Sequence, residues 1–434
     1  MKIISSYKVK IKYYNEIFAD TVAIYRKAVS FFMQICDAEW TTLEPLSGKN
    51  RNNCMEALSI RTARNPNPKY DFRVDFYKFP SYLRRAAIQA ALGSYASYKS
   101  NLVNWEKSNR QVRPPTPSLD RSVMPTLYKD NCYVKTGRNT ASIKIHHKND
   151  WVWLKTELRE QDIKYIESHC KLCKELVPTL KKSGKQWYLV FPFEQEVVLQ
   201  NKPIKDQVVC SVDLGVNNNA VCSAMLSDGT VVARKFINLA KEKDHLYKAL
   251  GRVKKAQQNG NRKTPVKWKH VNDLNTDISR KTAKAVLDFA LLHNADVLVF
   301  EYLDIRGRKR GSKKQRLHLW RKREIQKIAE HKAHKNGIRI SRICAWGTSK
   351  LAFDGSGKVK RNDDNYSLCR FASGKEYNCD LSASYNIGAR YYIREMLKSE
   401  PKMARLPDEA KVLRYGTGTT RTLSTLIRLN ADFE

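Results

Sequence analysis

The hydrophobic pattern of the chain alternates between helical stripes and short apolar runs. Apolar residues recur at helical spacing over 16–40 and again over 80–105, which predicts two long amphipathic helices. Pro80 stands near the start of the second segment, where its missing amide hydrogen does no harm. The polar stretches RTARNPNPKYD and RPPTPS follow the two segments and predict breaks between elements.

Strand-like runs surround these two helices. The start of the chain, MKIISSYKVKIKYY, alternates like a strand, and β-branched and aromatic residues fill NCYVKTG, ASIKIHH, WVWLKTEL and KQWYLVFPFEQEV. We therefore predict a β-platform with a helical insertion over residues 1–205.

The pattern changes at Val208. The run VVCSVDLGVNNNAVCSAMLSDGTVVARKFI predicts consecutive strands with a turn at Asp228 and Gly229. A basic helix is expected over 241–256, and a second long helix should end near His293. The apolar run ADVLVF then predicts a buried strand. This order of elements is typical of an α/β domain.

Three carboxylates stand in unlike contexts along this region. Asp213 ends an apolar strand run, Glu301 ends ADVLVFE, and Asp380 opens the helical segment DLSASYNIGARY. A carboxylate at a buried strand end is costly unless it is paired or binds a cation. If the three meet, their oxygens form a site for Mg²⁺ or Mn²⁺. Such ions can activate water against a phosphodiester, so we predict these residues as catalytic and metal-binding.

The charge balance indicates a polyanionic partner. The chain has 80 Lys and Arg against 43 Asp and Glu, a formal net charge of +37. Nucleic acid fits this excess because the neutralisation of phosphates releases condensed counterions. A basic surface kept only for solubility is the alternative.

The densest cationic run extends from Arg306 to Arg323. Its first half contains glycines and no apolar period, which predicts a loop, and its second half leads into a helix that Gly337 follows. Since apolar residues interleave with the cations, we interpret the run as a lid or channel wall that contacts phosphates. A solvated helix face and a targeting signal are the alternatives. The predicted nucleic-acid contacts are Arg306, Arg308, Lys309, Arg310, Lys313, Lys314, Arg316, Trp320, Arg321, Lys322 and Arg323.

Membrane and disulfide signals are weak. No stretch approaches the roughly 20 apolar residues of a membrane span, so we expect no membrane partner. The ten cysteines are scattered, as is usual for reduced thiols. Cys170 and Cys173 form one C-x-x-C pair, which we interpret as helical spacing because the surrounding pattern looks helical. Zinc binding, which would need four ligands, is the alternative.

The motifs DLGVN, VFEYL and CDLSASYNI, in this order, resemble those of RuvC-type nuclease domains. More specifically, the chain resembles TnpB proteins of insertion sequences and their descendants, the compact type V CRISPR effectors, including the V-F-like type. The stretch HKAHKNGIRISRICAWGTSK is similar to the family's helix, strand and TS element. The resemblance is strong over 208–394 and loose before that.

The resemblance implies an α+β multidomain fold. A β-barrel-like wedge domain would carry a helical recognition insertion, and an RNase H-like α/β nuclease domain of RuvC type would carry a degenerate zinc-ribbon-like insertion. The implied boundaries are 1–15 and 110–205 for the wedge, 16–109 for recognition, 206–343 and 380–396 for the nuclease, 344–379 for the ribbon and 397–434 for a tail.

The ribbon segment departs from the family pattern. The family carries C-x-x-C-G after TS and again before the last catalytic Asp, whereas this chain reads TSKLAFDG and CRFASG. Only Cys369 keeps a ligand-like position, so we expect no zinc. An unusual site with Cys344, Cys369 and Cys379 is the alternative. The residues expected to hold the ribbon by packing are Leu351, Phe353, Tyr366, Leu368 and Phe371.

The function implied by the resemblance is RNA-guided cleavage of DNA beside a short flanking motif. Asp213, Glu301 and Asp380 would hold Mg²⁺ or Mn²⁺, and base pairing with the guide RNA would supply specificity. The implied partners are guide RNA and double- and single-stranded target DNA, with a monomer or homodimer on the RNA in the cytoplasm of a prokaryotic cell. The guide could derive from a transposon end or a CRISPR array.

Two other functions are compatible with this chemistry. One is an RNA-guided binding protein that does not cut, such as a repressor, and the other is a transposon-encoded strand-transfer enzyme. The first is disfavoured because all three carboxylates are present. The second is disfavoured because such sites usually run Asp, Asp, Glu, whereas this chain has Asp, Glu, Asp.

Overall fold

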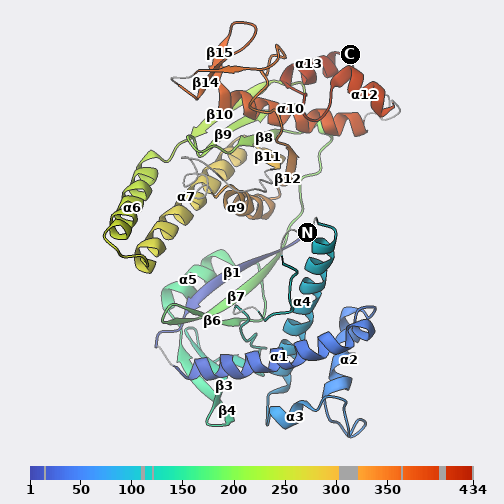
Figure 1. Ribbon diagram of the computed structural model, residues 1–434, viewed down its shortest axis with the longest axis vertical. Coiled ribbons are helices and arrows are strands. Elements are labelled where there is room, and N and C mark those ends of the chain that lie inside the picture. Colours follow the sequence, from blue (N-terminus) through green and yellow to red (C-terminus); the bar gives the residue numbers. More distant parts are fainter. Residues whose placement is uncertain are drawn as a thin grey trace. The chain divides into compact units, whose positions relative to one another are not determined.

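The computed structural model describes residues 1–13, 16–108, 113–119, 122–302, 321–362, 365–399 and 407–432. The chain divides into two compact units, one formed by 2–195 and the other by 196–434 with Met1. Each unit combines helices and sheets (Figure 1), so the predicted α+β multidomain class is confirmed. Among the described helices, none is long and apolar enough to cross a membrane.

The first unit contains two open sheets. Strand β7 (Gln186–Glu196) lies between β1 (Lys2–Lys10) and β5 (Lys174–Glu175) and also pairs with β6 (Thr179–Ser183). The second sheet has the order β2 (Tyr133–Lys135), β3 (Thr140–His147), β4 (Asp150–Glu157). The prediction of a barrel is wrong: within the described residues neither sheet closes, and the residues that follow β1 and β4 meet in an isolated bridge, Ile11 with Leu158, in place of a continuous ladder.

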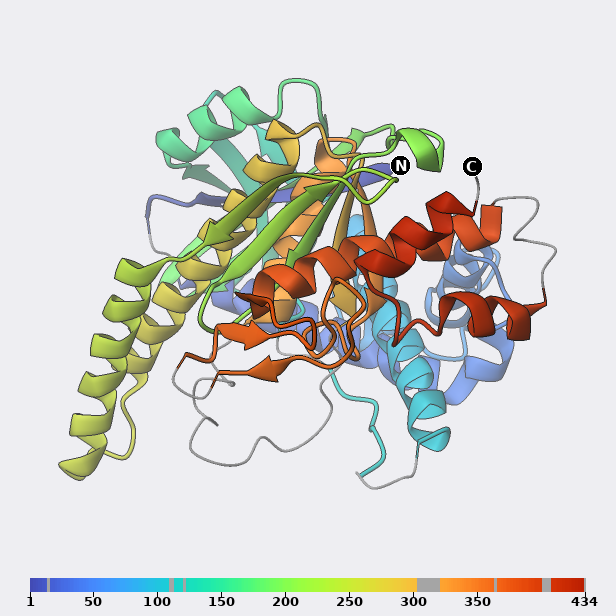
Figure 2. The same cartoon turned by 90° about the horizontal axis from the view of Figure 1, so that it is seen from above.

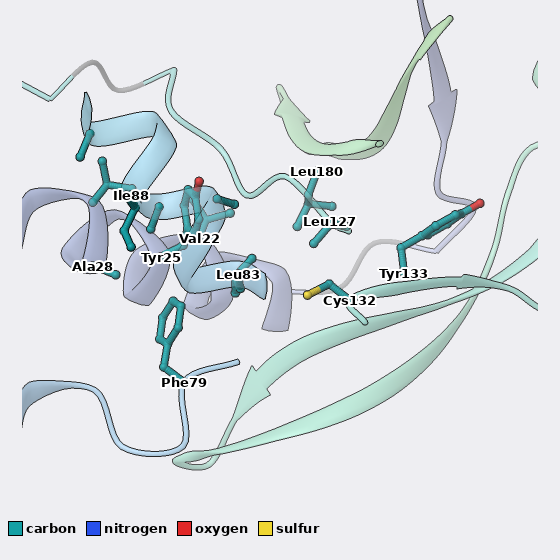
Figure 3. Packing of buried hydrophobic residues seen from close by; sticks show 14 of the residues in the cluster. Val22, Tyr25, Ala28, Phe79, Leu83, Ile88, Leu127, Cys132, Tyr133 and Leu180 are labelled. Atoms are coloured by element: carbon teal, nitrogen blue, oxygen red, sulfur yellow. The ribbon is translucent and has the colours of Figure 1, made fainter. Parts of the chain in front are cut away.

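The helices of this unit are α1 (Ile17–Leu43), α2 (Gly48–Ser59), α3 (Phe72–Asp75), α4 (Ser81–Glu106) and α5 (Glu160–His169). Helices α1 and α4 match the two predicted amphipathic segments, and they pack against each other. Figure 3 shows Tyr25 of α1 gathered with Leu83 and Ile88 of α4 in the hydrophobic core.

The second unit is built on a five-stranded sheet with the order β10-β9-β8-β11-β12. Antiparallel pairing joins β8, β9 and β10, whereas β8, β11 and β12 run parallel. The strands are β8 (Val209–Asp213), β9 (Ala220–Met225), β10 (Val231–Ile237), β11 (Val297–Tyr302) and β12 (Arg339–Cys344).

Helices cover both faces of this sheet, and successive residues of each strand point to opposite faces. Val209, Val297 and Val299 pack in one hydrophobic core with residues of α10 (Cys379–Ser399). Cys210, Leu298 and Phe300 pack in another, with residues of α7 (Pro265–Leu292) and α9 (Lys322–Lys335). This alternation assigns Asp213 and Glu301, two residues beyond Ser211 and Val299, to the face covered by α10.

Helix α6 (Ala240–Gln258) packs along α7. Figure 2 shows this pair as the light-green and yellow helices, which extend side by side away from the five-stranded sheet. The ribbon segment forms a small sheet of β13 (Lys360–Arg361), β14 (Leu368–Arg370) and β15 (Glu376–Asn378). A 3-10 turn, η1 (Ile204–Asp206), precedes β8.

The tail completes the core around α10. It contains α12 (Asp408–Tyr415) and α13 (Leu423–Ala431), and α13 packs on α10. Leu426 is fully buried in the same core as the α10 side chains. Gly229, with φ +94°, turns β9 into β10 against this helix, and a Cβ there would meet Leu423 and Ile427 at 3.2 Å.

Because Leu426 is fully buried, Leu426→Ala should destabilise the second unit by about 2–5 kcal/mol, through lost transfer free energy and a residual cavity. Chemical denaturation followed by circular dichroism measures the change. The control is Leu413→Ala on α12, where the side chain is 91% exposed and little change is expected. Equal stability of the two variants would show that α13 does not pack as described.

Candidate active site

Asp213 and Glu301 end neighbouring parallel strands. Val212 of β8 pairs with Phe300 of β11, so the next residue on each strand lies beside the other at the carboxyl edge of the sheet. Neighbouring strands are about 4.8 Å apart, and residues in register project from the same face. Glu301 is 8% exposed, while Asp213 is partly exposed.

Helix α10 brings the third carboxylate to this edge. Asp380 lies in its first turn. Asn218, in the loop after β8, donates from Nδ2 to Asp380 Oδ2 at 3.2 Å. Gly215 of the same loop is so near that a Cβ there would stand 3.7 Å from this oxygen. The structure thus brings Asp213, Glu301 and Asp380 to one edge of one face.

The electrostatics of Asp213 reflect this proximity. Although the residue as a whole is partly exposed, desolvation of the Asp213 carboxyl group raises its pKa well above its usual range, and the charges of Glu301 and Asp380 raise it further. Burial also raises the pKa of Glu301, whereas a hydrogen bond from Thr348 and the charges of Arg390 and Lys322 lower it. A cation bound here would relieve the repulsion between the carboxylates.

The donor set fits a hard divalent cation, because Mg²⁺ and Mn²⁺ prefer carboxylate and water oxygens. In the part of the chain that the structure describes, no three His, Cys, Asp or Glu side chains stand close enough to enclose an ion as they are. Asp213, Glu301 and Asp380 are the residues that would hold the ion.

Several polar residues that the sequence did not single out fix this edge. Gln326 of α9 donates from Nε2 to the carbonyl oxygen of Glu301 at 2.9 Å. The Thr348 hydroxyl donates to Oε1 of Glu301. Thr348 belongs to the TS element and Asn218 to the NNN run after β8, so both residues lie in motifs that the sequence analysis quoted. Their contacts with Glu301 and Asp380 join distant parts of the chain, so residue spacing could not predict them.

Arg390 binds two loops near the site to α10. It is 3% exposed, and its guanidinium donates to four backbone carbonyl oxygens, those of Cys344, Trp346, Thr419 and Arg421, at 2.7–3.0 Å. Burial lowers the pKa of Arg390 to about 10. One side chain thereby joins the loop after β12 and the segment before α13 to the helix that carries Asp380.

Most of the predicted cationic run lies outside the described residues. This applies to Arg306, Arg308, Lys309, Arg310, Lys313, Lys314, Arg316 and Trp320. Arg321 is described, and it donates to Thr276 and Asn272 of α7 at 2.6 and 2.8 Å. Lys322 is 8% exposed and its charge lowers the pKa of Glu301, whereas Arg323 is exposed. Lys322 is thus buried and close enough to Glu301 to influence its ionisation, and the nucleic-acid contacts of this run stay predictions.

A second cationic surface lies on α6. Lys241, Lys248, Arg252 and Lys255, here called the α6 basic stripe, are all exposed. Their spacings of seven, four and three residues place them on one face, over about 21 Å of helix. The buried residues of α6 are Leu246, Ala249, Leu250 and Val253, and by the same helical geometry they project from the opposite side.

The stripe differs from the neighbouring helix in its ion pairs. On α7, Lys269, Lys281 and Lys284 pair with Asp273, Asp277 and Asp288 one turn along at 2.6–2.9 Å. None of the four stripe cations has an ion pair within the described ranges. The stripe therefore presents uncompensated positive charge, which suits a polyanion.

The ribbon segment is held by aromatic side chains. Phe353 packs edge-on against Phe371, Tyr377 and Tyr385 with ring centroids 5.0–5.4 Å apart. The prediction that Tyr366 contributes to this packing is wrong, because its side chain is 57% exposed and lies under Arg361 at the surface. Asp354 accepts a hydrogen bond from Ser373 at 2.7 Å, which links the TSKLAFDG and CRFASG turns.

The cysteines of this segment differ in environment. Cys344 is exposed, whereas Cys369 and Cys379 are buried. Burial and the neighbouring Cys379 raise the pKa of the Cys369 thiol to about 12. Whether the segment folds without zinc stays a prediction.

The C-x-x-C pair of the first unit does not have the predicted helical spacing. Helix α5 ends at His169, and Cys173 donates its backbone N–H to the carbonyl oxygen of Cys170 at 3.0 Å in the turn that follows. The turn forms because Cys170 leaves the helical conformation, with φ −123° and ψ 19°. Neither cysteine forms a disulfide bond among the described residues.

Known proteins resemble this chain in sequence. The model of the Aq_aa04 family matches residues 5–147. The TnpB-like protein aq_aa05 of Aquifex aeolicus (strain VF5) is 28% identical over 233 residues, which cover 48% of this chain and 74% of that protein. The uncharacterized protein aq_aa04 of the same organism is 31% identical over 121 residues, which cover 25% of this chain and 66% of that protein.

A solved structure resembles the chain in fold. The matched chain in the cryo-EM structure of the Cas12f1-sgRNA-target DNA complex has a TM-score of 0.55 at 14% identity, and the match covers 86% of this chain and 81% of that one. At this identity the likeness concerns the fold alone. The TnpB-like relative confirms the resemblance to TnpB proteins that the motifs predicted.

Asp213→Asn should stabilise the metal-free protein at neutral pH. The raised pKa of Asp213 means that ionisation is less favourable in the folded state than in the unfolded state, where the pKa is about 3.9. Stability is therefore lost as the pH rises from that value toward the folded-state pKa, and Asn removes this loss. Thermal unfolding in EDTA between pH 4 and pH 8 measures the effect.

Asp244→Asn, at an exposed position of α6, is the control for this experiment and should leave the pH dependence unchanged. Mg²⁺ should raise the unfolding midpoint of the wild type more than that of Asp213→Asn, because a ligand of the folded state stabilises it. A wild-type midpoint that is independent of both pH and Mg²⁺ would contradict the assignment of this site.

Proposed function

We propose that this chain is an RNA-guided DNA endonuclease with a RuvC-type site formed by Asp213, Glu301 and Asp380. The observation that carries the proposal is the in-register end of β8 and β11 beside the first turn of α10. This arrangement collects three carboxylates at one sheet edge. The TnpB-like relative and the fold of the Cas12f1 effector support the same function.

The residues at this edge have different roles in the proposed reaction. Asp213, Glu301 and Asp380 hold divalent cations, which when bound supply Lewis acidity and activate water toward a phosphodiester. Asn218 orients the Asp380 carboxylate through its 3.2 Å hydrogen bond. Gln326 fixes the backbone of Glu301, so the position of the strand end does not depend on the cation.

The remaining parts of the chain take roles around this edge. The α6 basic stripe contacts a nucleic-acid backbone, because its exposed cations form no ion pairs within the described ranges. Guide RNA and target DNA are the proposed partners, as named for the Cas12f1 complex. Base pairing supplies the sequence specificity, while cationic side chains hold phosphates without reading bases.

The sharpest test begins with the RNA that co-purifies with the full chain. Sequencing this RNA defines the guide, and a matching DNA duplex with a randomised flank serves as substrate. Each of Asp213→Ala, Glu301→Ala and Asp380→Ala should abolish Mg²⁺-dependent cleavage while target binding stays near the wild-type level, because the substitutions remove metal ligands and leave the cationic surfaces in place. Gel-based cleavage and binding assays measure both quantities.

Asp408→Asn and Glu409→Gln on α12 are matched controls, since both side chains are exposed, and both variants should cleave normally. Cleavage that persists in all three alanine variants would place the site elsewhere. A wild-type complex that binds target DNA without cutting would favour the repressor alternative.

Neutralising the α6 basic stripe should weaken nucleic-acid binding without regard to sequence. Each lost phosphate contact should make the slope of log K against log salt less negative by about 0.7–0.9, so the four-site Gln variant should change it by up to roughly 2.8–3.6. Fluorescence anisotropy over a salt series measures the slope for RNA and for DNA separately.

The control for the stripe is the triple variant Lys269→Gln, Lys281→Gln and Lys284→Gln. These cations are already paired with aspartates on α7, so their loss should alter the slope much less. Equal slopes for the two variants would show that α6 has no special role in binding.

A further inference from the structure

Thr348 is placed to control the side chain of Glu301. It is 2% exposed, and its hydroxyl donates to Oε1 of Glu301. The same hydroxyl also lies 3.0 Å from the carbonyl oxygen of Ala345, and its single hydrogen can serve one acceptor fully at a time. Oε1 of Glu301 is thus engaged by a buried donor, which leaves Oε2 for other partners.

Side chains of α10 fix the backbone around Thr348. Asn386 donates from Nδ2 to the carbonyl oxygens of Thr348 and Leu351 at 3.0 and 2.9 Å. Arg390, one turn further along the same helix, donates to the carbonyl oxygens on the other side of Thr348. Gly347 has φ +79°, and a Cβ there would stand 2.8 Å from the carbonyl oxygen of Thr419. The hydroxyl is therefore held by the helix that carries Asp380.

The backbone of Glu301 has a separate support. Its carbonyl oxygen accepts from Gln326, and β11 pairs with both β8 and β12. Loss of the Thr348 hydroxyl would therefore leave the strand end in place and release only the carboxylate. Carboxylates that bind metals are commonly oriented by such hydrogen bonds from neighbouring residues.

We propose that Thr348 is a positioning residue that fixes Oε1 of Glu301 and presents Oε2 to a divalent cation. The inference rests on the proposed function, because it concerns the same carboxylate edge. It assigns to the threonine of the TS element a role in cation affinity, and it makes α10 the common support of two of the three carboxylates, Asp380 directly and Glu301 through Thr348.

Three variants of the full chain, purified with its RNA, test this role. Thr348→Val keeps the shape and removes the hydroxyl, whereas Thr348→Ser keeps the hydroxyl. Ser349→Ala is the control, because this neighbouring hydroxyl is partly exposed and makes no hydrogen bond among the described residues. Cleavage of a guide-matched DNA is measured over a Mg²⁺ series, and the Mg²⁺-induced rise in unfolding midpoint reports binding without catalysis.

Thr348→Val should need about 10–100-fold more Mg²⁺ for half-maximal cleavage, the usual range for loss of a group that orients a metal ligand. The Mg²⁺ dependence of its unfolding midpoint should shift by a similar factor. Thr348→Ser and Ser349→Ala should resemble the wild type in both measurements. Recovery by Ser is the decisive result, since a role in loop packing alone would not follow the hydroxyl.

Two results would overturn the inference alone. One is a Mg²⁺ requirement for cleavage in Thr348→Val that equals that of the wild type. The other is an equal loss of cleavage in Thr348→Val and Thr348→Ser, together with a lower unfolding midpoint of both variants in EDTA, which would show a structural role. In both cases the wild type still cleaves, so the proposed function stands. A wild type that neither cleaves nor responds to Mg²⁺ would remove the proposed function and this inference with it.

Discussion

The parallel pairing of β8 with β11 is the constraint on which the site depends. Residues 209–212 pair with residues 297–300 in strict register, so the last side chains of the two strands must share an edge and a face. A shift of one residue would turn Glu301 toward α7 and α9, because side chains alternate between faces. The two apolar cores on opposite faces hold this register, since each strand contributes alternate residues to both.

Helix α10 completes the carboxylate edge, because it adds Asp380 to the two strand ends. Gly388 allows the helix to approach β8 closely, because a Cβ there would lie 3.1 Å from Ser211 Oγ and from Met225 Sδ. Near its start the helix bears Asp380, and further along it Asn386 and Arg390 hold the loops around Thr348 and before α13. One element therefore determines a ligand position, a neighbouring loop and the attachment of the tail.

Local patterns in the sequence predicted the elements well where burial alone determines them. The helical stripes expected over 16–40 and 80–105 correspond to α1 and α4, and the run ADVLVF forms β11. The three carboxylates could be grouped because two follow apolar strands and one opens a helix. Their order along the chain also resembles that of a known set of nuclease motifs, which suggested a common site that hydrophobic periodicity alone could not indicate.

The parts that the sequence did not reveal depend on contacts between distant residues. Glu301 and Thr348 are 47 residues apart, and no spacing rule relates a strand end to a loop hydroxyl. The sheets of the first unit have strand-like sequences whether they close or stay open, so a barrel could not be distinguished from open sheets. Lys322 stood in a run of cations, and only its burial beside Glu301 separates it from its neighbours.

The burial of α13 against α10 has a consequence for how the protein is made. Chains are synthesised from the N-terminus, and domains generally fold as units. Strands β8 and β11, which end at Asp213 and Glu301, can pair as soon as both have been synthesised, but the core that includes α10 stays open to water until residues 423–431 have left the ribosome. During synthesis, the carboxylate edge therefore gains its full support only after almost all of this sequence has been translated.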